Sequence, residues 1–266
     1  MARNKIAGDL SPKRLRFLVK ILALCLCVLN TSCEFKKNEI EIDFDKNYDD
    51  FDLPLSLPYM ENFENGTFDN VENYTLQFVW RIVDDGGNMV LKCVEIDRDK
   101  IAAGSTILSL MIGDKTWESY VFSFDCKIPD DSWATFAPFA DTNADNYTPD
   151  YFDTRNPWSL SLDNEGVLLY RTIFSHGTHY IGEPDDEYVP SYSEYVAGYK
   201  KSKPIDGFIA DGWNHIQLIP AGLELHMEIN GVNIGKVAEL QEGISGRITI
   251  GGGVGTMFDN ISVESN

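Results

Sequence analysis

The chain has 266 residues, with 42 Asp and Glu against 22 Lys and Arg, a formal net charge of −20 and 43% hydrophobic residues. This acidic balance argues against a duplex nucleic acid as partner, because binding phosphates requires clustered Lys and Arg. Length and apolar content suffice for one large domain, and the acidity is typical of a soluble, calcium-tolerant surface protein.

Residues 1–32 have the layout of a secretory signal peptide. Six Lys and Arg lie within residues 1–20 against the single acid Asp9, and the apolar run 21–29 follows. That run is too short for a spanning helix, which needs ~20 residues. The next residues, Leu-Asn-Thr-Ser-Cys ending at Cys33, resemble the lipobox of bacterial lipoproteins. The resemblance implies that Cys33 is acylated and begins the mature chain; an ordinary signal peptide with an incidental cysteine is the alternative.

Residues 33–54 are predicted to form a flexible acidic tether, because they are rich in acids, poor in aliphatic clusters and end in prolines. Their first residues, Glu-Phe-Lys-Lys-Asn-Glu after Cys33, resemble the export tag of Gram-negative surface lipoproteins. This resemblance implies an outer-membrane lipoprotein exposed at the surface, with a membrane contact through its lipid. If the chain captures polysaccharide there, surface glycan-uptake proteins are its expected partners.

Residues 55–266 are predicted to form a single all-β domain. Helical periodicity is nearly absent there, while alternating runs bounded by Gly, Asn, Asp and Pro recur, which is typical of strands. So many strands without βαβ alternation predict an antiparallel β-sandwich of the jelly-roll type. The expected strands are 57–63, 76–83, 88–96, 105–112, 117–128, 134–140, 157–163, 167–174, 213–219, 223–229, 232–237, 246–251 and 256–264.

The clearest local prediction is a hairpin at residues 223–237. Leu-Glu-Leu-His-Met-Glu-Ile alternates apolar and polar residues, and Asn230-Gly231 supplies the two positive φ angles of a type I′ turn. Residues 213–237 and 246–264 then resemble the C-terminal half of concanavalin A-like lectin, glucanase and laminin-G-like jelly rolls. Residues 62–68, Asn-Phe-Glu-Asn-Gly-Thr-Phe, resemble the opening of such domains. The resemblance implies the fold, which hosts lectins, glycosidases, lyases and adhesion modules.

The same resemblance implies a structural calcium ion held where the chain opens and closes. The matching positions are Glu64 and Asp259, with Asn62 and Asn260 as neighbours. Calcium takes six to eight oxygen ligands, which two packed termini supply with backbone carbonyls. A turn acid at Glu64 and a solvated strand residue at Asp259 are the alternative.

A weaker calcium candidate lies in residues 141–153. Asp141, Asn143 and Asp145 alternate as in the first positions of a calcium-binding loop. The loop lacks the glycine at its sixth position and the glutamate at its twelfth. An Asx-rich loop without metal is therefore the favoured interpretation.

Two acidic runs imitate the paired carboxylates of glycoside hydrolases. A retaining enzyme needs a nucleophile and an acid ~5–5.5 Å apart. The first run resembles the motif of jelly-roll glucanases but not its setting, so a strand end that enters a charged turn is favoured. The second run offers a metal site or an acid/base group, but an exposed sheet face is favoured. The residues are Glu95, Asp97 and Asp99 in the first run, and Glu224, His226 and Glu228 in the second.

Aromatic residues gather between Trp133 and Tyr199, and residues 174–204 form an unusually long stretch without strand periodicity. Tyr and Trp combine an apolar face with a polar edge, which suits stacking on a sugar ring. Tyrosines that merely pin the loop are the alternative. The predicted carbohydrate-binding residues are Trp133, Tyr151, Trp158, Tyr170, Arg171, His176, His179 and Tyr180.

The sequence thus favours a surface-anchored lipoprotein whose sandwich binds polysaccharide. A glycoside hydrolase or polysaccharide lyase on the same fold, the latter using His176, His179 and nearby tyrosines, is the first alternative, and a non-catalytic adhesion or structural module is the second. Cys93 and Cys126 are expected to be free thiols, with one disulfide as the alternative.

Overall fold

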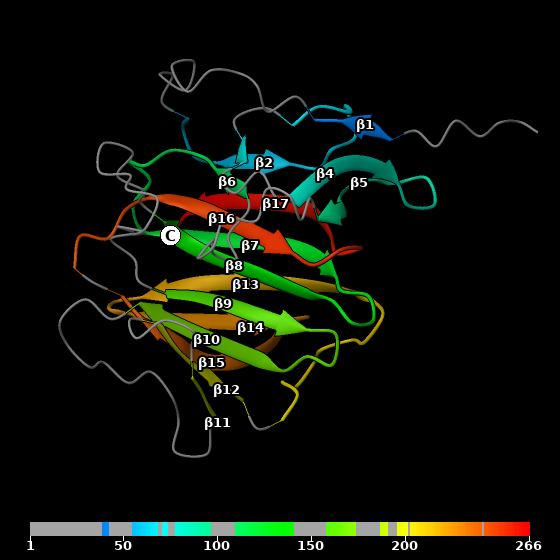
Figure 1. Ribbon diagram of the computed structural model, residues 1–266. Helices are drawn as coiled ribbons and strands as arrows, with labels where there is room; N and C mark the ends of the chain where they lie inside the picture. The colour runs from blue at the N-terminus through cyan, green and yellow to red at the C-terminus, as the bar shows by residue number, and fades with distance from the viewer. Residues whose placement is uncertain are drawn as a thin grey trace, which may run out of the picture. The chain divides into compact units, whose positions relative to one another are not determined.

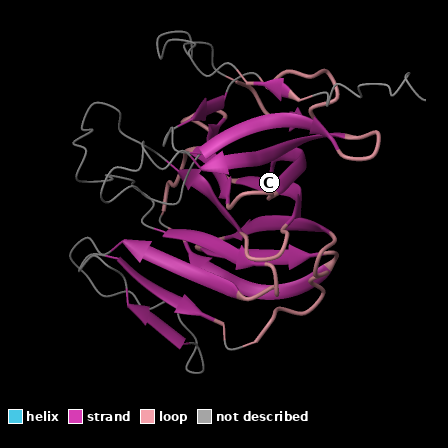
Figure 2. Cartoon of the chain, turned by 45° about the vertical axis from the view of Figure 1, so that its right-hand side comes forward, coloured by secondary structure: helices cyan, strands magenta, loops and turns pink. Residues whose placement is uncertain are grey.

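The computed structural model describes residues 39–42, 55–68, 71–73, 78–96, 110–140, 158–173, 187–190, 196–201, 203–240 and 242–266. Their regular structure is entirely β-strand, and nothing in these ranges forms a helix long and apolar enough to span a membrane (Figure 2). Residues 40–266 form one compact unit. The predicted all-β fold is confirmed.

The first sheet, sheet A, is antiparallel and runs in the order β1-β4-β5-β17-β7-β13-β14-β15, with β2 also paired to β17 (Figure 1). Because β17, the C-terminal strand, lies beside β2, β5 and β7, it ties the opening of the domain to its middle. The strands are β1 (Ile40–Glu41), β2 (Tyr59–Glu61), β4 (Phe78–Asp84), β5 (Met89–Ile96), β7 (Tyr120–Lys127), β13 (Trp213–Ala221), β14 (Glu224–Ile229), β15 (Val232–Glu239) and β17 (Met257–Ser265).

The second sheet, sheet B, is also antiparallel and runs in the order β11-β12-β10-β9-β8-β16-β6-β3. Consecutive strands such as β8, β9 and β10 are spatial neighbours, whereas β16 enters between β8 and β6. The strands are β3 (Val71–Asn73), β6 (Leu110–Ile112), β8 (Trp133–Ala140), β9 (Trp158–Asp163), β10 (Leu168–Ile173), β11 (Glu187–Pro190), β12 (Val196–Lys200) and β16 (Arg247–Gly252).

An aromatic core joins the two sheets. Phe124 of sheet A lies 5.0 Å from Phe136 of sheet B and 5.9 Å from Phe258, measured between ring centroids. All three side chains are fully buried. Burying each contributes roughly 1.5–3 kcal/mol. The alternation of buried and half-buried residues along β4 and β7 is what places one side of each strand in this core.

The predicted Asn-Gly hairpin is confirmed. Asn230 and Gly231 have φ angles of 50° and 77°, and Ile229 pairs with Val232 across the turn. All thirteen predicted strands overlap observed ones, with ends that shift by a few residues. The sandwich prediction therefore holds along the described part of the chain.

Four strands were not predicted. β3 is short, and β11 and β12 lie in the stretch 174–204 that we had interpreted as loop. β12 pairs with β10 and β11, so this stretch contributes the edge of sheet B. β1 falls inside the predicted tether: Ile40 pairs with Ile82, and Ile42 is buried. The remaining tether residues, 33–38 and 43–54, and the signal region lie outside the described residues.

Cys93 and Cys126 are buried free thiols, as expected. Burial raises the pKa of Cys93 to about 12 and also raises the pKa of Cys126. β17 lies between their strands, because Phe258 pairs with Cys126 on one side and with Leu91 on the other. Strands two positions apart are separated by ~9.5 Å. A disulfide needs Cα atoms within ~7 Å, so this pair does not form one.

Candidate functional site

The segment from Lys201 to Gly207 crosses from sheet B to sheet A at one edge of the sandwich. The backbone N–H of Lys201 donates to Leu168 O (2.8 Å) and that of Ile205 donates to Gly166 O (2.9 Å). At the far end, the Asn230 amide donates to Gly207 O (2.8 Å). Each end of the segment is thus held by a different sheet.

Gly207 has to be glycine at this crossing. Its φ is +82°, and a Cβ there would lie 2.8 Å from Val232 Cγ2 and 3.0 Å from Ile229 O. A larger residue would therefore push the segment away from the hairpin of β14 and β15. The close approach fixes where the segment lies relative to β15.

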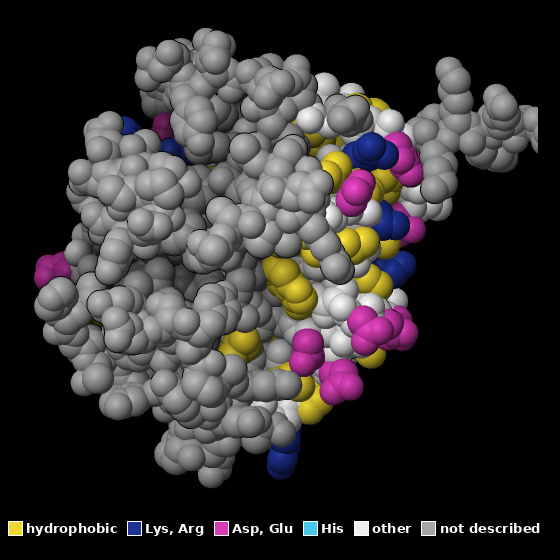
Figure 3. Space-filling model, in the orientation of Figure 1, with side chains coloured by type: hydrophobic (Ala, Val, Ile, Leu, Met, Phe, Trp, Pro, Cys, Tyr) yellow, Lys and Arg dark blue, Asp and Glu magenta, His cyan; other side chains and the backbone are white. Residues whose placement is uncertain are grey.

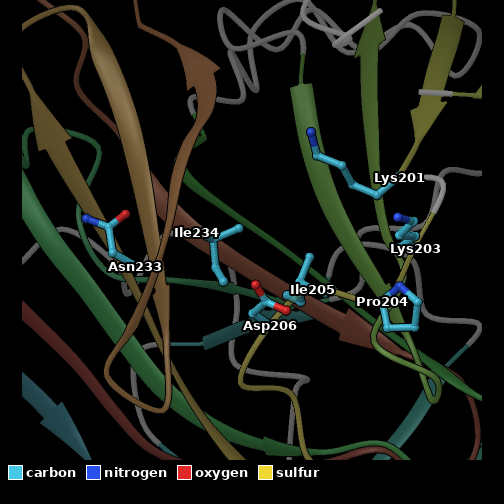
Figure 4. A pocket seen from close by; sticks show the side chains of 7 residues that line it. All are labelled: Lys201, Lys203, Pro204, Ile205, Asp206, Asn233 and Ile234. Carbon is cyan, nitrogen blue, oxygen red and sulfur yellow. The ribbon is translucent and has the colours of Figure 1, made fainter. Parts of the chain in front are cut away.

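A pocket of about 300 Å³ opens between this segment and β15. In Figure 4 the two lysines and Pro204 lie on one side, and Asn233 and Ile234 of β15 lie on the other. The volume is at the lower end of the range for small-molecule sites. The lining residues are Lys201, Lys203, Pro204, Ile205, Asp206, Asn233 and Ile234.

The pocket combines aliphatic walls with polar groups. Ile205 is 9% exposed and Ile234 packs against the core, so both are held in place from behind. Asn233 accepts a hydrogen bond from the N–H of Gly235 (2.7 Å) through Oδ1, which leaves its two amide hydrogens for another acceptor. Lys203 and Asp206 are exposed and make no hydrogen bond or ion pair with any other described residue.

The middle of sheet B's outward face is lined by buried hydroxyls. Ala134 and Phe136 point into the core, so Thr135 between them points outward. Thr135 Oγ1 donates to Leu160 O (2.9 Å) and accepts from Ser161 Oγ (3.1 Å), and Thr249 Oγ1 donates to Ala137 O (3.4 Å). Thr135 and Thr249 are fully buried, and their hydroxyls serve the sheet itself.

Facing carboxylate pairs are missing from the four adjacent strands β6, β16, β8 and β9 of sheet B. Asp163 is the only acidic residue of β6, β8, β9 and β16. Its Oδ1 accepts from the N–H groups of Glu165 (3.0 Å) and Val167 (2.8 Å) in the turn to β10. These four strands therefore lack the two facing carboxylates that glycoside hydrolysis requires.

Among the predicted carbohydrate-binding residues, only the Trp133 side chain is described. Its ring is half-buried and meets Phe78 edge to face at 6.1 Å, at the rim of the core. The backbones of Trp158 in β9 and of Tyr170 and Arg171 in β10 are placed in sheet B. The other predicted residues, Tyr151, His176, His179 and Tyr180, lie outside the described residues, as do Asp141, Asn143 and Asp145.

Glu64 and Asp259, predicted to come together, lie in one polar cluster beside the β4–β5 turn. Asp259 Oδ2 accepts from Asn88 Nδ2 (2.8 Å), and Glu64 Oε1 accepts from the N–H of the next residue, Met89 (3.0 Å). Asp259 is 4% exposed. Burial, followed by the charges of Asp125 and Glu64, raises the pKa of Asp259 despite these hydrogen bonds.

The cluster continues across sheet A to Asp125 and His215, which the sequence did not indicate. Asn260 Nδ2 donates to Asp125 Oδ2 (2.7 Å), and Asp125 Oδ1 lies 2.7 Å from His215 Nδ1. Cross-strand register aligns them, because Asp125 pairs with both Asp259 and His215. The described residues contain no group of three His, Cys, Asp or Glu poised to hold a metal.

The second acidic run forms a solvated charge network. The Glu224 carboxylate lies 3.1 Å from His226 Nε2 and 3.6 Å from Lys236 Nζ. The hydrogen bond with His226 lowers the pKa of Glu224. All of these groups are on the exposed side of β14 and β15. In the first run only Glu95 is described, and it is exposed.

No protein-family model and no curated protein sequence matches the chain. Solved β-sandwiches similar to it include a carbohydrate-binding module, CBM66, from Bacillus subtilis (12% identity, TM-score 0.43, covering 74% of this chain and 96% of that one). Others are a putative glycosyl hydrolase from Parabacteroides distasonis (13%, 0.45, 78% and 94%) and a galectin from Caenorhabditis elegans (9%, 0.36, 56% and 85%). Likenesses of this size say nothing about what this chain binds.

Proposed function

We propose that this chain is an exported glycan-binding protein and that the pocket between residues 201–206 and β15 is a sugar subsite. The observation that carries the proposal is the combination of aliphatic walls with uncommitted polar groups in one recess. A sugar ring presents C–H faces and hydroxyls at once. The Ile205 and Ile234 side chains can pack against the C–H face. The Asp206 carboxylate and the Asn233 amide can form hydrogen bonds with the hydroxyls.

The predicted anchor fits the position of this pocket. With Cys33 acylated, only residues 34–39 separate the lipid from β1, a reach of at most ~20 Å. β1 and β15 are the first and last strands in the order of sheet A, and Figure 1 shows them at opposite ends of the sandwich. The anchored domain would then present its pocket away from the outer membrane, toward glycans and toward partner proteins for their uptake.

Calcium at Glu64 and Asp259 is part of the proposal, as a structural ion. The two carboxylates are chemically suitable, since carboxylate oxygens are among the ligands that calcium prefers. Asp259 is nearly fully buried and close enough to Glu64 and Asp125 for their charges to raise its pKa. A divalent cation would relieve that repulsion and fasten the opening of the domain to β17.

Affinity gel electrophoresis of the purified chain in a panel of neutral and acidic polysaccharides tests the glycan proposal. Asn233→Ala should weaken retention, since it removes an amide that lines the pocket. Asn164→Ala is the matched control, because Asn164 lies in the β9–β10 turn and makes one long hydrogen bond to Asp130 (3.3 Å). Retention by no polysaccharide, or equal retention of both variants and the parent, would contradict the proposal.

A further inference from the structure

The pocket has a local charge opposite in sign to that of the whole chain. Two lysines and one aspartate line it, although acids outnumber bases 42 to 22 overall. On the face shown in Figure 3, several described acidic side chains gather at the lower right, with basic side chains above and below them. The two lysines in the lining of the pocket thus contrast with the acidic balance of the chain.

Lys203 is the cation best placed to meet a ligand. Two other described lysines are engaged by acids: Lys127 lies 3.8 Å from Asp85, and Lys236 lies 3.1 Å from Glu239. Lys203 forms no such pair with described residues, even though Asp206 lines the same pocket. An ammonium held at a pocket rim without a partner is a ready site for an anionic group.

We infer that the pocket selects an acidic sugar, one that carries a carboxylate or a sulfate ester. This rests on the proposed glycan-binding function. The anionic group lies against the Lys203 ammonium, with Lys201 adding positive charge beside it. The ring hydroxyls donate to Asp206 and accept from the Asn233 amide, and the C–H face lies over Ile205 and Ile234. A neutral sugar would make the hydroxyl contacts and the C–H contacts but would lack the contact with the Lys203 ammonium.

Asp206 orients the ligand without preventing its binding. Lys203 and Asp206 are not paired, so a ring that spans the pocket can place its anion at the former and its hydroxyls at the latter. The remaining charges of the chain act from farther away. At 0.1 M ionic strength they are screened over ~10 Å, so the groups that touch the ligand decide its preference.

The test compares ligands that differ only in charge. Isothermal titration measures the Kd of the full-length chain for oligogalacturonate and for the same oligosaccharide after carboxyl reduction. A second arm uses a sulfated galactan oligosaccharide and its desulfated form, which separates the two sources of anionic group. Lys203→Gln is compared with Lys115→Gln, which removes the same charge from an exposed turn before β7.

We expect at least one acidic ligand to bind ~10-fold or more tightly than its neutral form, and Lys203→Gln to remove most of that preference. Lys115→Gln should leave it unchanged. Equal binding of acidic and neutral forms, or equal effects of the two lysine variants, would overturn the selection for acidic sugars while leaving glycan binding intact. Binding of neither form by a chain that melts normally would overturn both.

Discussion

The turn that follows the pocket segment depends on one buried amide, so Asn214→Ala should destabilise the domain more than any exposed Asn→Ala change. Asn214 is fully buried in β13. Its Oδ1 accepts from the Ile209 N–H (2.7 Å) and from Asn230 Nδ2 (3.0 Å). Its Nδ2 donates to Ile209 O (2.9 Å) and Gly212 O (3.1 Å). One side chain thus holds both the 209–212 turn and the Asn-Gly hairpin.

The expected size of the effect follows from these four hydrogen bonds. Each contributes ~1 kcal/mol, and Asn230 can recover one of its bonds from water, which leaves a loss of about 3 kcal/mol. For a domain of this size, that corresponds to a fall in Tm of ~6–12 °C. No alanine methyl group can replace the lost contacts, because the three backbone partners and the Asn230 amide need a donor or an acceptor.

Differential scanning calorimetry of Asn214→Ala and Asn65→Ala measures this directly. Asn65 is the matched control: it is exposed and accepts a single hydrogen bond, from the Thr67 N–H (2.9 Å). Its replacement should cost less than ~1 kcal/mol. If the two variants melt within ~2 °C of each other, the buried amide does not organise the crossing, and the reasoning fails.

Three further predictions concern charge, thiols and the anchor. Because burial raises the pKa of Asp259, its carboxyl group stabilises the fold fully only below the ordinary pKa of 3.8, and this stabilisation is lost as the pH rises through the raised pKa. In EDTA, the Tm of Asp259→Asn should therefore rise relative to the Tm of the parent between pH 3 and pH 7. Calcium should raise the Tm of the parent and leave that of Asp259→Asn unchanged. A pH-independent difference would contradict this. With its pKa raised to about 12, Cys93 should react with a thiol reagent only after denaturation, and rapid native labelling would show that β5 opens. Cys33→Ser should move the exported chain from the membrane fraction to the soluble one, and an unchanged distribution would refute the acylated anchor.

Besides the fold class, the features that the sequence predicted correctly are local. Alternation along 223–229 and the pair Asn230-Gly231 define a hairpin without reference to the rest of the chain. β12, in contrast, contains glycine and belongs to a Tyr-rich stretch whose apolar residues do not alternate over enough positions. Its pairing with β10 stabilises it instead.

The candidate site depends on contacts that no spacing reveals. Lys203 and Asn233 line one pocket because a segment between two sheets passes a strand edge 30 residues later in the chain. Asp125 joins Asp259 and His215 only through the register of β7 with β17 and β13. The proximity of Glu64 to Asp259 was expected only because the opening and closing motifs resemble those of a known fold.

The most direct test of glycan binding at this pocket is a crystal structure of the chain with bound trigalacturonate. The account predicts a sugar ring between residues 203–206 and β15, with its carboxylate at the Lys203 ammonium, a hydroxyl at Asn233 Nδ2 and its apolar face over Ile234. A ligand bound instead on the outward face of sheet B beside Trp133, with the pocket holding only water, would contradict it.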